Sequence, residues 1–362
     1  MHSITLFVAS ALVAGASAGS WVIQHDYAHH NFFDMFDFYD GADPTNGFVE
    51  YVDSATANSS ALTEITPQNQ IYIGVDHTST ITSTGRPSVR LNSTASYNSG
   101  LVILDLEHFP GGICGTWPAF WMFGPDWPQH GEIDIFEGVN TQSANQMTLH
   151  TANGCQISST HGAMAGTVSS TDCYAYADGN TGCAVHDDST STYSGFNANK
   201  GGVFATQIDP VNQVIQIWFF DRSNIPADIK AGTPTVESWG MPRAHFGGCD
   251  IETHFSDLTI VFDNTFCGDW AGNSWSSDST CASEADSCDD YVANNPSAFK
   301  DAYWLINSLK VQLHGEEHLA ICTQRASRAS LRVSICARRG SANRHRAWFI
   351  PHQYRWPTTQ ST

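Results

Sequence analysis

Basic residues are scarce in this 362-residue chain: 16 lysines and arginines stand against 36 aspartates and glutamates, which gives a formal net charge of −20. A chain of that charge would repel nucleic acids and anionic membrane surfaces, so neither is expected as a partner. No apolar run in the sequence, including the one near its start, reaches the roughly 20 residues that a membrane-spanning helix needs. A neutral polymer would meet no such electrostatic barrier.

Metal-binding patterns are absent from the sequence as well. None of the ten cysteines forms a Cys-x-x-Cys pair, and no Asp-rich loop has the spacing of a calcium site. We therefore expect no metal and no cofactor. Eight of the ten cysteines precede Lys310, and in a secreted chain disulfides are the better interpretation. Eight cysteines allow many connectivities, so no pairing is predicted.

Residues 1–18 predict a secretion signal. An apolar run, Ile4 to Ala14, precedes Ala16-Ser17-Ala18, the small-x-small pattern that signal peptidase cuts. We expect the mature protein to begin just after this segment and to be secreted to the extracellular medium. Asn58 and Asn92 begin Asn-x-Ser/Thr sequons, which are possible glycan acceptors on that route.

Glycine and aromatic residues are abundant, with 29 Gly, 11 Trp and 20 Phe. This composition favours many short strands joined by turns, and the predicted fold class is all-β. Leu101 to Leu106 is apolar enough to be buried on both faces. Val203–Ile208 and Val214–Asp221 are expected to form a hairpin. Further strands are expected at both ends of 32–53 and at 71–75, 88–91, 101–109, 257–263 and 302–311.

Two cysteine-bearing segments show no strand pattern. Residues 155–200 are polar and aperiodic, and a loop of that length normally argues against a compact domain. We expect disulfides to order it as a wall beside a cleft. Residues 281–296 are likewise expected to be a loop. Because nothing repeats and no linker divides the chain, residues 19–311 are predicted to form one domain.

An unusual acidic segment, GEIDIFEG at Gly131–Gly138, contains Glu132, Asp134 and Glu137 between apolar residues. Side chains alternate along a strand, so Glu132 and Asp134 share one face while Glu137 would take the other. A β-bulge at Ile135-Phe136 would return Glu137 to their face, and bulges are frequent beside active sites. The three carboxylates would then line one cleft.

Paired carboxylates of this kind suit glycosidases. The two glutamate backbones would lie about 13 Å apart along the strand, and inward-leaning side chains could approach the gap of about 5 Å that retaining enzymes use. Asp134 between them adds like-charge repulsion and a hydrogen-bond partner, which can hold a proton on one neighbour near neutral pH. The alternative is a solvated acidic strand edge.

Aromatic residues crowd the segment just before these acids. An aromatic ring can pack flat against the apolar face of a sugar ring, and Trp117, between Thr116 and Pro118, is the better candidate for such a platform. For Phe120 and Trp121, core packing is an equally good interpretation. His150 follows on the next expected strand, within reach of the carboxylates, although an isolated histidine is more often structural.

The acidic motif, its setting GTWPAFWMFGPDWPQHGEIDIFEGVN (115–140) and MTLHT (147–151) resemble glycoside hydrolase family 16, specifically fungal laminarinase-type endo-1,3(4)-β-glucanases. The resemblance covers about residues 19–311, as one catalytic domain. It implies a jelly-roll β-sandwich of two antiparallel sheets with a substrate cleft on the concave face. It also implies Glu132 as nucleophile, Asp134 as its helper and Glu137 as acid/base, with substrate-binding side chains at Trp117, Trp121, Asn140 and His150.

The resemblance implies a secreted, monomeric endo-β-glucanase. It would hydrolyse internal β-1,3 linkages, and β-1,4 linkages adjacent to β-1,3, with retention of configuration. One alternative is a transglycosylase that uses the same residues with a sugar as acceptor. Another is a glucan-binding lectin that has lost the chemistry, against which the intact carboxylates argue. Linkage preference depends on loop shapes that the sequence does not fix.

The composition changes abruptly after Val311. Residues 311–362 hold eight arginines against two glutamates, and the family-like sequence ends at the same boundary. We expect residues 312–362 to be a gene-model artefact, such as a translated intron or a frameshifted end. The alternatives are a basic arm that binds anionic wall polymers and a disordered extension.

Overall fold

The computed structural model describes residues 21–27, 29–82, 85–158 and 162–315. The expected signal segment, almost all of the basic tail, and Cys322 and Cys336 lie outside these residues. Within the described ranges, no helix has the length and apolar character needed to cross a membrane.

Strands dominate the described chain. They are β1 (Trp21–Asp26), β2 (Phe36–Phe38), β3 (Val49–Tyr51), β4 (Thr63–Ile65), β5 (Ile71–Ile73), β6 (Arg86–Ser88), β7 (Leu91–Tyr97), β8 (Gly100–His108), β9 (Thr116–Phe123), β10 (Glu132–Glu137), β11 (Gln146–His150), β12 (Thr167–Ser170), β13 (Cys183–His186), β14 (Gly202–Asp209), β15 (Val214–Asp221), β16 (Ala244–Gly247), β17 (Leu258–Phe266) and β18 (Trp304–His314).

The helices are short. The α-helices are α1 (Ser54–Ser59), α2 (Ala227–Ala231), α3 (Ile251–His254), α4 (Ser279–Ala282) and α5 (Cys288–Asn294). Single 3₁₀ turns occur at His29–Asn31, Phe33–Met35, Thr190–Thr192, Arg222–Asn224, Val236–Ser238, Trp275–Ser277 and Pro296–Phe299, and a π-helical turn at Gly268–Gly272.

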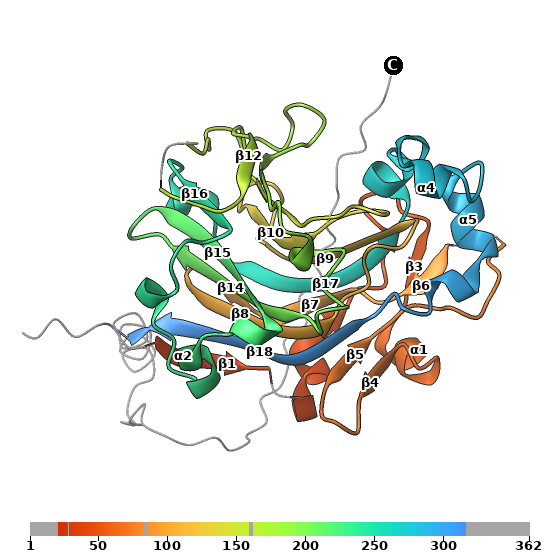
Figure 1. The fold of residues 1–362 in the computed structure, drawn as a ribbon, viewed down its shortest axis with the longest axis horizontal. Helices are drawn as coiled ribbons and strands as arrows, with labels where there is room; N and C mark the ends of the chain where they lie inside the picture. Colours follow the sequence, from red (N-terminus) through yellow and green to blue (C-terminus); the bar gives the residue numbers. More distant parts are fainter. Residues whose placement is uncertain (1–20, 28, 83–84, 159–161, 316–362) are drawn as a thin grey trace, which may run out of the picture.

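Two antiparallel sheets pack face to face, as the all-β prediction expected (Figure 1). Sheet one has the order β16-β15-β14-β8-β18-β5-β4, with β1 also paired to β18. Sheet two has the order β12-β13-β11-β10-β9-β17-β7-β2. A small parallel pair, β3 and β6, lies at one end, where α4 and α5 also lie. The sandwich puts the acidic strand β10 in the middle of sheet two.

The main core lies between the two sheets and follows the alternation of their strands. From sheet one it receives side chains such as Leu104 and Phe204, and from sheet two Phe120 and Ile133. Phe136 of β10 stacks on Phe204 across the gap, with ring centroids 4.7 Å apart. The strands of sheet two thus turn one face toward this core; we call the opposite surface of sheet two, which carries the acids of β10, the open face.

The far side of sheet one is covered too. Leu101 and Ile103 of β8 pack there with Trp218 and Trp239, beneath the segment that joins β15 to β16 and contains α2. Leu104 and Leu106 face the main core. The prediction that Leu101–Leu106 is buried on both faces is confirmed.

The predicted hairpin and final strand are confirmed as β14–β15 and β18. The prediction for 88–91 was wrong in detail, because the chain there leaves β6 and enters β7. Residues 155–200, expected to be a loop, contain β12 and β13 at the edge of sheet two. Residues 281–296, also expected to be a loop, contain the end of α4 and all of α5. The side chains of Asp278 and Ser287 cap the N-termini of these two helices.

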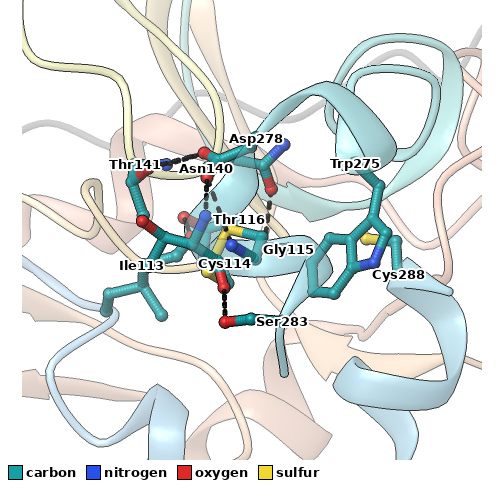
Figure 2. Close-up of a disulfide and its surroundings, with 12 residues drawn as sticks. Ile113, Cys114, Gly115, Thr116, Asn140, Thr141, Trp275, Asp278, Ser283 and Cys288 are labelled. Atoms are coloured by element: carbon teal, nitrogen blue, oxygen red, sulfur yellow. Dashed lines mark hydrogen bonds between the residues drawn. A yellow bond between two sulfur atoms is a disulfide. The ribbon is translucent and has the colours of Figure 1, made fainter. Parts of the chain in front are cut away.

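Disulfides pin these irregular segments, as predicted. Cys155–Cys249 ties the long segment to the turn after β16, and Cys173–Cys183 closes a loop within it. Cys114–Cys281 anchors the helical segment to the start of β9, and Cys267–Cys288 anchors it to the end of β17. Figure 2 shows the Cys114 bridge among its hydrogen-bonded neighbours. Together with Phe266, Trp275 and Phe299 these cysteines form a second small core.

Candidate active site

The bulge predicted in β10 is present. Against β9, Asp134 pairs with Trp121 and Glu137 with Ala119, and the register shifts between Asp134 and Phe136. Ile135 and Phe136 are both almost fully buried in the main core. The extra residue therefore returns Glu137 to the face of Glu132 and Asp134, and all three carboxylates lie on the open face of sheet two.

Each glutamate accepts a hydrogen bond from an indole. Trp127 Nε1 donates to Glu132 Oε2 at 2.6 Å, and Trp117 Nε1 donates to Glu137 Oε1 at 2.8 Å. Both carboxyl groups are only partly exposed. These donors hold the two acids in fixed orientations and leave one oxygen of each without an indole partner. Trp117, predicted as a sugar platform, therefore also orients a carboxyl group.

His150 lies beside the two other acids. It pairs with Glu132 across β10 and β11, and its Nε2 lies 3.5 Å from Asp134 Oδ2 and 3.9 Å from Glu132 Oε1. Burial lowers the pKa of His150 to about 4, so the imidazole is neutral at neutral pH. Donor atoms of these three residues lie within 4.8 Å of one another, close enough to hold a cation together.

The carboxyl groups strongly perturb one another. Burial, followed by the charge of Glu137, raises the pKa of Glu132 above its usual range. Burial also raises the pKa of Glu137, although the hydrogen bond from Trp117 opposes the shift. Burial and the two glutamates raise the pKa of Asp134 well above its usual range. The acids cannot all ionise near neutral pH, so the site retains protons.

For Phe120 and Trp121 the sequence did not decide between core packing and sugar binding, and the structure places them on opposite faces of β9. Phe120 faces the main core, whereas Trp121 lies on the open face, where its ring contacts Phe123 and the Arg90 guanidinium. Trp117 is also partly exposed there and packs edge-on against Trp270. Trp117 and Trp121 are therefore both placed where a sugar could meet them.

Asn140 does not fit its predicted role in substrate binding. It is 2% exposed, its Oδ1 accepts a bond from the Gly115 amide, and its Nδ2 donates to the Ala271 carbonyl and to Ser274. Figure 2 shows it within the polar network around the Cys114 disulfide. Its carboxamide holds the disulfide-linked segment together, and its contacts do not support a sugar-binding role.

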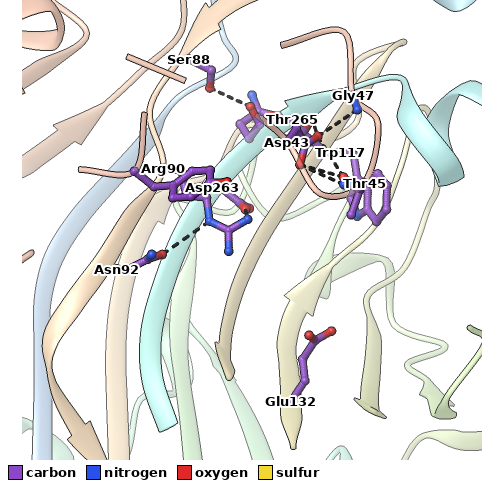
Figure 3. Close-up of polar contacts among 12 residues, drawn as sticks. Asp43, Thr45, Gly47, Ser88, Arg90, Asn92, Trp117, Glu132, Asp263 and Thr265 are labelled. Carbon is purple, nitrogen blue, oxygen red and sulfur yellow. Dashed lines mark hydrogen bonds and ion pairs between the residues drawn. The ribbon is translucent and has the colours of Figure 1, made fainter. Parts of the chain in front are cut away.

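Sequence reasoning missed three residues near the acids. Arg90 and Asp263 form an ion pair at 3.9 Å, and both side chains are nearly buried; Figure 3 draws them together with Trp117 and Glu132. Tyr176, from the loop closed by Cys173–Cys183, is 52% exposed and packs edge-on against Trp127. The only sequence signal for them is chemical type, because their positions depend on strand order and on a disulfide.

The sequence of this domain matches a known enzyme family. The XgeA-like catalytic domain of glycoside hydrolase family 16 matches residues 36–312. The chain belongs to glycoside hydrolase family 16. The resemblance inferred from the sequence is thereby confirmed, and so is the jelly-roll sandwich that it implied.

Family 16 relatives are named as glucanases. A probable endo-1,3(4)-β-glucanase of Aspergillus niger is 43% identical over 352 residues, which are 95% of this chain and 47% of that protein. An endo-1,3(4)-β-glucanase of Arthroderma benhamiae is 44% identical over 322 residues, 87% of this chain and 69% of that protein. The chain spans about half the length of the Aspergillus relatives it matches.

Two solved structures align with most of this chain. Family 16 laminarinase 16A of Phanerochaete chrysosporium, with 6-O-glucosyl-laminaritriose in donor and acceptor sites, has a TM-score of 0.75 and 40% identity. An elongating family 16 β-1,3-glucosyltransferase has a TM-score of 0.75 and 45% identity. Each alignment covers 81% of this chain and 100% of the other.

Proposed function

We propose that the protein is an endo-β-glucanase. It hydrolyses internal β-1,3 linkages, and β-1,4 linkages adjacent to β-1,3, in glucans such as laminarin, with retention of configuration. The observation that carries the proposal is the bulged strand β10, which brings Glu132 and Glu137 to one face, each held by an indole N–H. The names of the family 16 relatives support the substrate class.

The reaction proceeds by double displacement. A carboxylate oxygen of Glu132 attacks the anomeric carbon while Glu137 gives its proton to the departing glycosidic oxygen, so the glycosidic C–O bond breaks and a glycosyl ester forms. Glu137 then takes a proton from water, and the water oxygen attacks the same carbon. The ester bond breaks, Glu132 leaves as a carboxylate, and two inversions give net retention.

The electrostatics of the site suit this cycle. One glutamate must be ionised and the other protonated when substrate arrives. Burial and like-charge repulsion keep a proton in the site near neutral pH. The other glutamate can ionise because an indole N–H stabilises its anion. The assignment of nucleophile to Glu132 and of acid/base to Glu137 follows the family motif, since burial raises the pKa of both glutamates and each accepts an indole hydrogen bond.

Aromatic rings on the open face would bind the sugar chain. Trp117 and Trp121 lie among the carboxyl groups, and Tyr176 extends the surface at the Trp127 end. Such rings pack on the apolar faces of pyranoses without needing charge on the ligand. This fits a neutral polysaccharide acted on by a chain of net charge −20.

We also propose that the protein acts as a monomer outside the cell. Four disulfides within the described residues support an oxidising compartment. An intact mass of the natively secreted protein would test both the removal of residues 1–18 and the presence of residues 312–362.

Transglycosylation is the second candidate, because one solved relative at 45% identity is an elongating glucosyltransferase. The same glycosyl ester would then be released by a sugar hydroxyl instead of water. Incubation with laminarin, lichenan and a β-1,6-branched glucan, followed by sizing of the products, decides between them. Hydrolysis gives progressively shorter oligosaccharides, and transfer gives chains longer than the substrate. Binding to glucan without product release would support the lectin alternative and reject both.

A further inference from the structure

A row of three residues crosses the open face next to the acid/base glutamate. On β9, Ala119 pairs with Glu137 of β10 on one side and with Asp263 of β17 on the other. Directly paired residues in antiparallel strands point to the same face. Asp263 and Glu137 therefore face each other over a methyl group, two interstrand spacings or roughly 9 to 10 Å apart at the backbone.

The neighbouring row shows why Ala119 matters. There, Trp121 stands between Asp134 of β10 and Val261 of β17, so a large ring fills the middle position. In the Ala119 row, the small side chain leaves the two carboxyl groups without a bulky group between them. Asp263 is 6% exposed, and little water can screen it from Glu137.

The charged and titratable groups packed against Asp263 come from several elements. Its ion-pair partner is Arg90, which lies between β6 and β7 and is itself nearly buried. Arg90 stacks against Tyr39, Trp121 and Phe123, which fixes its guanidinium in place. The other groups are Asp43 in the loop after β2, Tyr51 of β3, and Glu132, Asp134 and Glu137 of β10.

Two of these neighbours, Asp43 and Tyr51, are held by hydrogen bonds or stay neutral. Asp43 accepts hydrogen bonds from Thr45, Gly47 and Thr265 (Figure 3). Burial raises the pKa of Tyr51 well above its usual range, so its hydroxyl stays neutral. Burial raises the pKa of Asp263 to about 7, and the charge of Arg90 opposes that shift. Burial raises the pKa of Glu137 as well.

We propose that Asp263 is a positioning residue for the proposed glucanase reaction: its carboxylate acts across Ala119 to keep the catalytic proton on Glu137. As the pH rises, negative charge that develops on Asp263 repels charge on Glu137 and delays loss of the proton that the leaving group needs. The positive charge of Arg90 favours the ionised form of Asp263 and so opposes the effect of burial on that carboxyl group. The acid/base glutamate thus stays protonated at pH values where an isolated carboxyl group would not.

The test is the pH profile of kcat/KM on laminarin for Asp263→Asn. Removing the negative charge lowers the pKa of Glu137, so the alkaline limb is expected to move to lower pH by about half a unit to one unit. Asp263→Glu keeps the charge and should leave that limb close to its position in the native protein. Asp37→Asn is the matched control. This substitution removes one negative charge from the same sheet, but Asp37 is exposed on edge strand β2, so the alkaline limb should not move.

The outcomes are distinct. A merely structural role would reduce kcat or thermal stability without moving the limb, and an unchanged limb in a folded Asp263→Asn protein overturns the proposal. If that variant does not fold because Arg90 is left unpaired, Asp263→Glu carries the test: a limb that falls by half a unit or more despite the retained charge contradicts the idea. The inference rests on the proposed function, and a native protein without activity on any β-glucan would refute that function first.

Discussion

Removing the indole N–H of Trp127 should reveal which step Glu132 serves. Trp127→Phe keeps an aromatic ring beside Tyr176 but deletes the 2.6 Å hydrogen bond to Glu132 Oε2. A hydrogen bond to a charged group contributes about 1.5 to 3 kcal/mol. If most of that favours the carboxylate over the acid, the pKa of Glu132 rises by about one to two units, at about 1.4 kcal/mol per unit.

The expected result is a shift of the acid limb of kcat/KM to higher pH. That limb reports ionisation of the nucleophile in the free enzyme. A loss of about ten- to a hundredfold in kcat/KM at pH 5 should accompany the shift, because fewer molecules then carry an ionised Glu132. The assay is initial-rate release of reducing sugar from laminarin between pH 3 and 9, with circular dichroism to confirm folding.

Trp117→Phe is the matched variant, since Trp117 donates the equivalent bond to Glu137 at 2.8 Å. Here the pKa of the acid/base should rise, so the alkaline limb moves to higher pH while the acid limb stays. If Trp127→Phe moved the alkaline limb and Trp117→Phe the acid limb, the two glutamates would have exchanged roles. If both limbs stayed fixed in both folded variants, the reasoning about indole-tuned carboxyl groups would be wrong.

Three further predictions concern the same face. Glu132→Gln and Glu137→Gln should each abolish hydrolysis of laminarin; residual activity above about one part in a thousand in Glu132→Gln would reject it as nucleophile. Tyr176→Ala should raise KM for laminarin about fivefold while Tyr176→Phe leaves it unchanged, because a ring contact contributes about 1 kcal/mol; equal KM values would remove Tyr176 from the binding surface. In thermal unfolding, Glu132→Gln should exceed the native protein in Tm at pH 8, with the difference shrinking toward pH 4. Burial raises the folded-state pKa of Glu132 above its unfolded value, so the native fold loses stability as the pH rises between the two values. A pH-independent difference would contradict this.

The alternation of polar and apolar residues along β10 allowed the positions of the three acids to be predicted from the sequence. Glu132, Asp134 and the apolar residues between them fix which face is polar, and the doubled apolar pair before Glu137 requires a bulge if all three acids are to be together. Each of these inferences uses neighbours within six positions. The register shift between Asp134 and Phe136 confirms the predicted bulge.

The remainder of the site depends on contacts between distant segments. Asp263 is near Glu137 only because β17 lies next to β9, and no local pattern states the order of strands in a sheet. Tyr176 is near Trp127 because disulfides hold its loop against the sheet edge. Asn140 was assigned from its place in the family motif, yet its burial directs its carboxamide to the backbone of Gly115 and Ala271.

The missed secondary structure has different causes. β12 is four residues long and lies at the edge of sheet two, so it needs neither apolar alternation nor β-branched residues on both faces. Asp278 and Ser287 cap the N-termini of α4 and α5, but no helix was predicted from these caps. Both helices are too short for an amphipathic period to emerge, and cysteine bridges, more than helix propensity, stabilise that segment.

The buried acids on the open face of sheet two destabilise the folded state, and the packed core and the disulfides around them offset this cost. Burying Glu132, Asp134, Glu137 and Asp263 together raises the pKa of each, which means that their ionised forms destabilise the fold near neutral pH. On the opposite face of the same strands, Phe136 and its aromatic neighbours fill the main core, while disulfides secure segments at both ends. A rigid sheet with a packed rear face can therefore hold repelling acids at fixed separations, which the proposed reaction needs if one acid is to keep its proton while the other is ionised.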